Sequence, residues 1–375
     1  MNTKIKNIVV CVVMAVCIFG FAVLCLVLPK PEFLDSERRE PAKFPELTVD
    51  SIMKDGAEYT DSFMKQFDDK YTPDNFPFRD LFKSLKAFVN VNVFGFRDKD
   101  GIYIENGYVA EMQEKIDENS IDHASTILNY IYNTYLKNKG ITPYISIIPD
   151  KGYFLSEENG YPTMNYDEFI DKILAEVDFA TYIKIKDSLS VEDYYKTDTH
   201  WRQEELVDIA KLLVDGMGGN HDSKYTVNEL ANPFKGVYFD RAPRPLKPET
   251  MYYLTNENMK NVKVYDHQNK KEISLYDMAK AEGKDPDDMF LGGELSAVTI
   301  ENPDAKTDKE LVIFRDSYGR SIIPLLVDDY AKITVIDIRY ISSSMTLRYL
   351  VQFEDQDVLF LYSTLVLNAS YEMKK

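Results

Sequence analysis

The most constraining feature of the sequence is an apolar run close to its N-terminus. Residues 8–28 contain no charged side chain. A helix rises 1.5 Å per residue, so about twenty apolar residues can cross the ~30 Å hydrocarbon core of a bilayer. Lys4 and Lys6 precede the run. The positive-inside rule therefore predicts a cytoplasmic N-terminus, with nearly all of the chain on the far side of the membrane.

A cleaved signal peptide is the alternative to an anchor. Signal peptides usually have a shorter apolar region that ends in a small-x-small cleavage site. The exit from this run reads Leu-Val-Leu-Pro-Lys-Pro over residues 26–31, without small residues. We therefore predict an uncleaved anchor, which makes the protein a single-pass protein of the cell membrane with an extracytoplasmic C-terminal domain.

Cysteine usage and charge exclude several kinds of site. All three cysteines (Cys11, Cys17 and Cys25) lie in the apolar run. The rest of the chain is therefore expected to have no disulfide, no Cys-ligated metal and no thiol nucleophile. The formal net charge is −18. Nucleic-acid binders usually carry a basic excess or a basic stripe, so we predict no nucleic-acid partner.

Beyond the anchor, the composition divides the chain into a linker and one large domain. Residues 29–45 are rich in proline and charge, which predicts a stalk. We expect a cytoplasmic tip and transmembrane anchor over residues 1–30, a stalk and lead-in over 31–75, and the main domain over 76–375. Within that domain, residues from about 220 to 297 are irregular and charged, and we interpret them as an insertion that shapes a cleft.

Helical and strand patterns alternate along the main domain. Helical spacing predicts helices over residues 61–67, 81–90, 123–137, 166–177, 203–213, 321–327 and 345–353. Apolar runs predict strands over 141–148, 182–185, 311–314, 333–338 and 358–362, and a hairpin over 101–109. Such alternation predicts a parallel sheet with helices on both faces, in which ligands bind at the C-terminal ends of the strands.

The first motif that could carry chemistry is Asp-Thr-His-Trp at residues 198–201. It contains one of only four histidines and the only tryptophan. In an Asp-x-His segment both side chains can reach the same side, and Asp198 could orient the imidazole of His200 as in a catalytic triad. The alternative is structural, with Thr197 or Asp198 capping a helix that begins near Gln203. A metal site is a third alternative, but no matching ligand cluster is visible elsewhere, so we predict no metal.

The second motif lies where a buried strand runs into a turn and a helix, at residues 311–321. Ser317 would project there at the C-terminal edge of the sheet, and the following helix N-terminus offers free N–H groups to an oxyanion. Serine needs a positioned base, and His200 is the best candidate in the chain. The alternative is an ordinary strand–helix turn in which Asp316 or Ser317 caps the helix.

Together these motifs resemble the DHHW family of SGNH-hydrolase-like proteins, a group that includes the alginate O-acetyltransferases. The likeness runs from about Phe76 to the C-terminus. It is supported by Phe-Pro-Phe-Arg-Asp at 76–80, Ile-Pro-Asp-Lys at 148–151, Phe-Leu-Gly-Gly at 290–293 and Ile-Asp-Ile-Arg-Tyr at 336–340. The resemblance implies an SGNH-like three-layer α/β/α fold with Asp198, His200 and Ser317 as the triad.

The resemblance also implies the surroundings of the triad. The oxyanion would be held by backbone N–H groups around Ser317 and Tyr318, with Gly293 as a further contributor. Glu294 stands where the family pattern leads us to expect asparagine. The candidates for contacting a saccharide are residues in or beside the motifs, namely Trp201, Arg315, Arg320 and Tyr340. Alternatively, the arginines near the motifs (Arg202, Arg315, Arg320 and Arg339) pair with neighbouring acids.

The activity implied by the resemblance is acetyl transfer to a hydroxyl of a cell-surface or exported polysaccharide. Ser317 would carry the acetyl group, and the chain itself would need no cofactor. A multipass membrane acyltransferase of the MBOAT type is the expected donor partner, and a cell-surface glycan the expected acceptor. Two alternatives stay open: an acetyl esterase with the same triad, and a non-catalytic glycan-binding or assembly protein that retains the fold.

Overall fold

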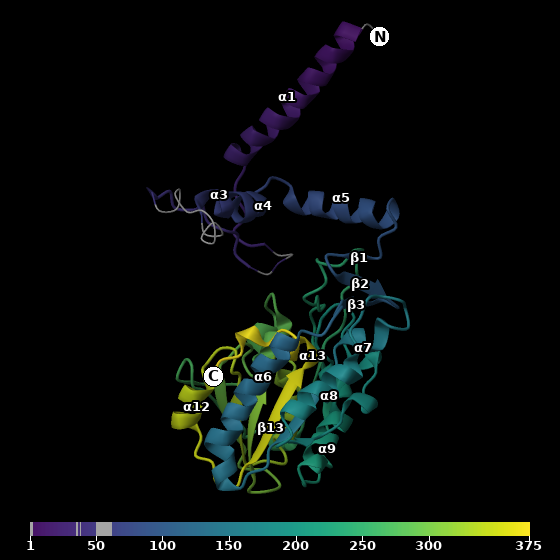
Figure 1. The fold of residues 1–375 in the computed structure, drawn as a ribbon. Coiled ribbons are helices and arrows are strands. Elements are labelled where there is room, and N and C mark those ends of the chain that lie inside the picture. Colours follow the sequence, from purple (N-terminus) through teal and green to yellow (C-terminus); the bar gives the residue numbers. More distant parts are fainter. Residues whose placement is uncertain (1–2, 35–36, 38, 50–61) are drawn as a thin grey trace. The chain divides into compact units, whose positions relative to one another are not determined.

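The computed structural model describes residues 3–34, 37, 39–49 and 62–375. The chain forms two compact units (Figure 1). The first contains residues up to Lys99 together with 240–245, and the second contains residues 100–239 and 246–375. The main domain that we predicted from residue 76 onward thus begins about one helix later, because residues 76–99 group with the first unit.

The first unit opens with α1, which spans Thr3–Val27. An 18-residue window of this helix has a mean hydropathy of 3.1, and none of that window is buried. The helix is therefore long and apolar enough to cross a membrane, either as an anchor or as a signal sequence. This outcome agrees with the apolar run identified in the sequence.

The stalk and lead-in are more ordered in their described part than a linker would be. They contain α3 (Phe63–Gln66), η2 (Phe67–Tyr71) and α4 (Thr72–Asp74), and α5 (Arg79–Asn92) follows. Arg39 forms a 2.6 Å ion pair with the buried Asp74. Glu37 pairs with both Arg79 and Lys83, and these charges hold the pKa of Glu37 near 2 against the raising effect of its partial burial. The helix predicted over 61–67 is thus present from Phe63, while Asp61 lies outside the described residues.

The second unit is built on a mixed sheet whose eight described strands lie in the order β5-β4-β13-β11-β12-β10-β8-β9. The strands are β4 (Tyr144–Ile148), β5 (Thr181–Tyr182), β8 (Lys263–Asp266), β9 (Lys271–Ile273), β10 (Ala297–Glu301), β11 (Glu310–Arg315), β12 (Lys332–Ile336) and β13 (Asp357–Ser363). The five from β5 to β12 are parallel, as the alternation predicted. The last three are antiparallel.

The antiparallel part corrects our interpretation of residues 220–297. That stretch is not a separate insertion, because its strands β8 and β9 extend the main sheet beyond β10. The side chains of β8 alternate between exposed and buried positions, as expected of a strand with one solvated face. The same stretch also contains the two-stranded sheet of β6 (Thr226–Glu229) and β7 (Tyr252–Thr255), α10 (Met278–Ala281) and η9 (Pro286–Met289).

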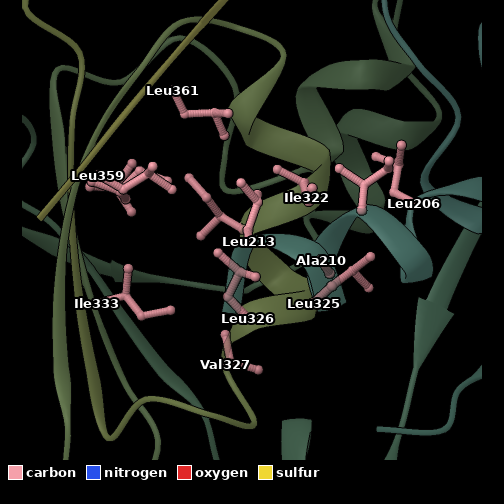
Figure 2. Close-up of a cluster of buried hydrophobic side chains, with 14 of the residues drawn as sticks. Leu206, Ala210, Leu213, Ile322, Leu325, Leu326, Val327, Ile333, Leu359 and Leu361 are labelled. Carbon is pink, nitrogen blue, oxygen red and sulfur yellow. The ribbon is translucent and has the colours of Figure 1, made fainter. Parts of the chain in front are cut away.

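Helices cover both faces of the sheet and make a three-layer α/β/α structure. One face packs against α9 (Val207–Gly216) and α11 (Gly319–Leu326), and the other against α6 (Glu118–Ile131), α8 (Tyr166–Glu176) and α12 (Ser343–Leu350). Because successive strand residues point to opposite faces, β13 sends Leu359 and Leu361 into the first layer and Val358 and Phe360 into the second. Figure 2 shows the first of these clusters, with Leu213 of α9 and Leu326 of α11 beside the sheet.

The remaining elements are short. A hairpin joins β2 (Ile102–Glu105) to β3 (Tyr108–Glu111) through Asn106 and Gly107, whose φ angles are 51° and 86°. Positive φ at both turn positions is what a tight two-residue hairpin requires. The other described elements are β1 (Asp98–Lys99), η3 (Tyr132–Leu136), η4 (Lys137–Lys139), α7 (Lys151–Leu155), η5 (Lys186–Ser188), η6 (Val191–Asp193), η7 (Gln203–Glu205), η8 (Glu257–Met259), α13 (Thr364–Leu367) and η10 (Ser370–Glu372).

Candidate active site

The turn that carries Ser317 is fixed to the C-terminal ends of two parallel strands. β11 ends at Arg315, and the next residue, Asp316, is fully buried. Its carboxylate accepts hydrogen bonds from the backbone N–H of Tyr318 (3.0 Å) and from that of Ser363 at the end of β13 (2.7 Å). Ser317 itself is only partly buried. The sequence analysis predicted this position at the strand edge, and the structure shows the serine there.

Asp198 and His200 lie within a closed loop formed by residues 194–201. Tyr194 and Trp201 pair as an antiparallel bridge, and the N–H of Tyr195 donates to the carbonyl of His200 (3.1 Å). The N–H of His200 donates to Oδ1 of Asp198 (2.9 Å), a local turn that aspartate side chains favour. Nδ1 of His200 lies 2.7 Å from the same oxygen. The loop thus holds the imidazole against the carboxylate.

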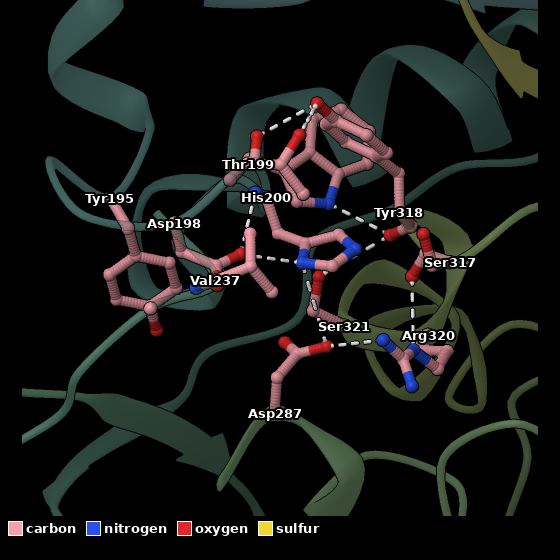
Figure 3. Close-up of polar contacts among 12 residues, drawn as sticks. Tyr195, Asp198, Thr199, His200, Val237, Asp287, Ser317, Tyr318, Arg320 and Ser321 are labelled. Carbon is pink, nitrogen blue, oxygen red and sulfur yellow. Dashed lines mark hydrogen bonds and ion pairs between the residues drawn. The ribbon is translucent and has the colours of Figure 1, made fainter. Parts of the chain in front are cut away.

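The electrostatics of this pair suit proton transfer. Burial alone would raise the pKa of Asp198, but the charge and hydrogen bonds of His200 outweigh it and lower that pKa. Burial alone would lower the pKa of His200, but the carboxylates of Asp287 and Asp198 raise it. Nε2 of His200 has no hydrogen-bond partner among the described residues and points to the side of the site where Ser317 lies (Figure 3). This is the arrangement of a general base oriented by an acid.

A second carboxylate, which the sequence analysis missed, lies beside the same imidazole. Oδ2 of Asp287, on η9, is 3.7 Å from Nδ1 of His200 and 2.7 Å from a terminal nitrogen of Arg320. Arg320 also binds Asp288 (2.7 Å), and its Nε donates to the carbonyl of Ser317 (3.3 Å). Arg320 therefore connects the acid beside His200 to the backbone of Ser317. In the sequence, Pro-Asp-Asp at 286–288 looked like part of a solvated charged stretch.

Three of the four residues that we predicted to contact a saccharide are buried, which corrects that prediction. Trp201 is 0% exposed, and its Nε1 donates to the carbonyl of Tyr318 (2.8 Å). Arg315 is 1% exposed and is bound to Asp337 (3.0 Å). Arg320 is 5% exposed and is held by Asp287 and Asp288. Their bonding partners are within the protein, so these residues position the site. Tyr340, at 40% exposed, is accessible to a ligand.

The other two motif arginines also pair with acids. Arg202 binds Glu204 (2.8 Å), and Arg339 binds Asp337 (2.7 Å). Of the two interpretations of these arginines, the structure thus supports pairing with neighbouring carboxylates. Any contact with an anionic saccharide would have to compete with those carboxylates.

Some of the N–H groups that we predicted to hold the oxyanion already donate hydrogen bonds within the protein. The N–H of Tyr318 already donates to Asp316, and that of Gly293 donates to the carbonyl of Phe290 (3.1 Å). Within the described chain, the N–H of Ser317 itself has no acceptor. Glu294 is exposed, and its carboxylate meets the hydroxyl of Tyr340, where it adds to the effect of burial in raising the pKa of that phenol. The carboxylate is thus bound to a side chain outside the triad.

Two further residues that support the loop were not predicted as site residues. Lys151 is fully buried, and its Nζ donates to the carbonyls of Tyr195 (2.9 Å), Lys196 (3.3 Å) and Asp198 (2.6 Å). Burial lowers the pKa of Lys151 to about 7. Gly236 packs so closely that an added Cβ would lie 2.3 Å from the carbonyl oxygen of Thr197. The next residue, Val237, donates its N–H to Oδ2 of Asp198 (2.7 Å).

The carboxylates near His200 bind other groups of the protein. In the part of the chain that the structure describes, no group of three or more His, Cys, Asp or Glu side chains is arranged to hold a metal ion. The acids around His200 are instead bound to the imidazole, to Arg320 and to backbone N–H groups.

Comparison with solved structures defines the fold. A DHHW family protein from Eubacterium siraeum superimposes with a TM-score of 0.58 at 19% identity, covering 74% of this chain and 97% of its own. PatB1 of Bacillus cereus, solved with a sulfonyl adduct, gives a TM-score of 0.59 at 17% identity, covering 73% and 98%. No protein-family model matches the sequence, and no curated protein matches it either. The predicted resemblance to the DHHW family is thus confirmed as a shared α/β/α fold.

Proposed function

We propose that this protein is a membrane-anchored serine O-acyltransferase that acetylates hydroxyl groups of an extracytoplasmic polysaccharide. The observation that carries the proposal is the buried Asp198–His200 pair. Nε2 of His200 has no hydrogen-bond partner among the described residues and faces the turn that bears Ser317. The fold shared with the DHHW family protein and the motif resemblance to alginate O-acetyltransferases support the choice of reaction.

The first half-reaction loads the serine. Nε2 of His200 takes the proton from the hydroxyl of Ser317 while Oγ bonds to the carbonyl carbon of the acetyl donor. The bond to the leaving group then breaks, and His200 returns the proton to that group. Asp198 stabilises the imidazolium that exists between these two proton transfers. Nε2 and Oγ are not hydrogen-bonded in this structure, and such catalytic bonds often tighten only when substrate is present.

The second half-reaction unloads the serine onto the acceptor. His200 takes the proton of a saccharide hydroxyl, whose oxygen attacks the acetyl carbonyl. The ester bond to Oγ breaks, and Ser317 recovers its proton from His200. In both halves the N–H of Ser317 is the donor best placed to stabilise the oxyanion, because the N–H groups of Tyr318 and Gly293 are engaged elsewhere.

The anchor limits the source of the acetyl group. If α1 spans the membrane and the second unit is extracytoplasmic, Ser317 cannot reach cytoplasmic acetyl-CoA. The proposal therefore includes a multipass membrane acyltransferase of the MBOAT type as the donor partner and a cell-surface glycan as the acceptor. No cofactor is assigned to this chain.

Acetyl transfer by the purified full-length protein tests the proposal. With an aryl acetate as donor and a polysaccharide as acceptor, acetylated glycan should form, and Ser317→Ala or His200→Gln should lower kcat about a thousandfold or more. Ser188→Ala and His123→Gln, which change the same residue types away from the site, are the matched controls. A sulfonyl fluoride should label the native protein and the two control variants but not Ser317→Ala.

The products distinguish the alternatives. If water accepts the acetyl group whichever glycan is offered, the enzyme is an esterase with the same triad. If the folded protein turns over no acetyl ester, resists the sulfonyl fluoride and still binds glycan, the fold serves a non-catalytic role and the proposal is wrong.

A further inference from the structure

The helix α5 carries an apolar face that is open to solvent. Leu81, Leu85 and Phe88 are 66%, 54% and 60% exposed, although they lie in the middle of a regular helix of 14 residues. Phe78, just before the helix, is also exposed, and Phe82 is 41% exposed. Soluble proteins rarely leave such a contiguous apolar surface in water, so the face is expected to contact something apolar.

These residues form one stripe with a polar face opposite. Positions 78, 81, 85 and 88 are three or four residues apart, and such positions lie on the same side of a helix. The opposite side carries Lys83 and Asn90, and Lys86 lies between that side and the stripe. After the helix ends, the exposed apolar surface continues through three large residues, namely Val93, Phe94 and Phe96.

Contacts with α1 locate this stripe at the end of the candidate membrane span. The ring of Phe21, in α1, stacks on Phe76 with centroids 5.5 Å apart and meets Phe82 of α5 edge-on at 5.7 Å. Phe21 precedes the last residue of α1, Val27, by about 9 Å of helix rise. Amphipathic helices that lie on membranes bury their apolar faces by about 5–10 Å. The distance of Phe21 from the end of α1 thus matches the depth to which such helices bury their apolar faces.

We propose that α5 lies in the membrane interface of the leaflet in which α1 ends, with its apolar stripe in the acyl-chain region and its lysine-bearing side toward the lipid headgroups. The occupant of the stripe is lipid, because Phe82 of that stripe is packed on a residue inside the apolar span. The aromatic side chains of Phe78, Phe82 and Phe88 suit this boundary. This inference does not depend on the proposed catalytic function.

Cysteine accessibility tests the inference in the full-length protein. All native cysteines lie in α1, so replacing them with alanine leaves a background without thiols. Leu85→Cys and Lys86→Cys are then adjacent in sequence but about 100° apart around α5, with Leu85 in the stripe and Lys86 beside it. In vesicles of phosphatidylethanolamine and phosphatidylglycerol that contain no other protein, a water-soluble maleimide should label Leu85→Cys about tenfold more slowly than Lys86→Cys.

Controls keep the outcome interpretable. Both thiols should react equally after the vesicles are dissolved and the protein is denatured. Phe88→Cys repeats the measurement on the stripe, and Asn90→Cys repeats it on the polar side, in case one variant does not fold. Equal rates on both sides in the lipid vesicles would overturn the inference. Protection that appears only in native membranes would also overturn it, because a protein partner would then cover the stripe.

Discussion

Asp287 changes the environment of the imidazole that we assign as the general base. His200 has the carboxylates of Asp198 and Asp287 near the same nitrogen. Arg320 binds Asp287 and so limits the negative charge that His200 experiences. The basicity of His200 therefore depends on three residues, of which only Asp198 is close to it in sequence.

Replacing Asp287 should shift the pH dependence of activity. A general base must be neutral to accept a proton, so kcat/KM should rise with pH through the pKa of His200. Asp287 raises that pKa and Arg320 lowers it. Asp287→Asn should therefore move the acidic limb of the pH–rate profile to lower pH. Asp288→Asn is the matched control, because Asp288 also binds Arg320, and it should leave the limb nearly in place. If the acidic limb does not move in Asp287→Asn, Asp287 does not raise the pKa of the general base.

Lys151 should make the stability of the protein pH-dependent. In the folded state its pKa is about 7, whereas an unfolded lysine has a pKa of about 10.4. Between these values the unfolded chain binds more protons, so the contribution of Lys151 to the free energy of unfolding rises with pH, by up to about 1.4 kcal/mol per unit. Denaturant unfolding should show the advantage of wild type over Lys151→Met growing between pH 7 and pH 9.

A control for this measurement is Lys184→Met, which changes an exposed lysine. Its stability difference from wild type should not vary over the same pH range. A constant difference for Lys151→Met as well would mean that the ammonium keeps its proton, held by the three carbonyls of the loop.

At the scale of elements, two loops meet to make the acid part of the site. The loop of residues 194–201 presents Asp198, and the segment around Gly236 closes over it. The N–H of Gly236 donates to the hydroxyl of Thr197 (3.1 Å), and the next N–H binds the carboxylate of Asp198. Glycine at position 236 permits this contact, because a Cβ atom there would lie only 2.4 Å from the Cβ atom of Asp198.

Gly236→Ala should therefore separate the two loops. We expect a loss of about 1–3 kcal/mol in the free energy of unfolding, the usual cost of inserting a methyl group into a packed site. The value of kcat should fall more than KM rises, because the displaced group is Asp198 and not a substrate contact. Asn232→Ala, at an exposed position of the same segment, is the control. A variant with wild-type kcat and stability would contradict the close packing.

The elements that the sequence predicted well are those with strong local patterns. The buried strands β4, β11, β12 and β13 appear in the sequence as largely apolar runs, and the turn after β11 followed directly from one of them. β8 and β9 are short, carry charges and have one solvated face, so their pairing with β10 left little local signal. Of the strand expected at 182–185, only Tyr182 lies in a strand, namely the two-residue β5 (Thr181–Tyr182).

The candidate site residues differ in how local their signal is. Asp198, His200 and Ser317 could be selected as candidates because their motifs are local and resemble a known family, and their catalytic roles stay predictions. The burial of Arg315 depends on Asp337, at the end of a different strand, and the role of Asp287 depends on Arg320, 33 residues away. Residue type alone cannot distinguish an arginine that binds a ligand from one that neutralises an internal acid, so those predictions required the tertiary structure.

At the scale of the whole molecule, the amphipathic α5 and the apolar α1 bring two kinds of membrane-compatible surface into one compact unit. The proposed function requires the second unit to be exported, since the proposed acceptor is a cell-surface glycan. The topology can be measured independently of any enzymatic activity.

We expect alkaline phosphatase fused after Lys375 to be active in cells, because that enzyme folds only outside the cytoplasm. The mass of the protein isolated from membranes should include α1, as expected for an anchor, and the membrane fraction should retain the protein after a wash at high salt. An inactive phosphatase fusion would contradict the orientation that Lys4 and Lys6 predict. A mature chain that lacks α1 would identify the helix as a signal sequence.

Because Trp201 is the only tryptophan in the chain, the protein carries a built-in optical reporter. Its indole is bonded to the carbonyl of Tyr318, one residue from Ser317, and meets the Tyr318 ring edge-on at 5.8 Å. Indole emission responds to such local changes, and no second tryptophan dilutes the signal. Loading of Ser317 with an acyl group should thus be visible as a change in intrinsic fluorescence, which would give the lifetime of the acyl-enzyme without a label or a chromogenic donor.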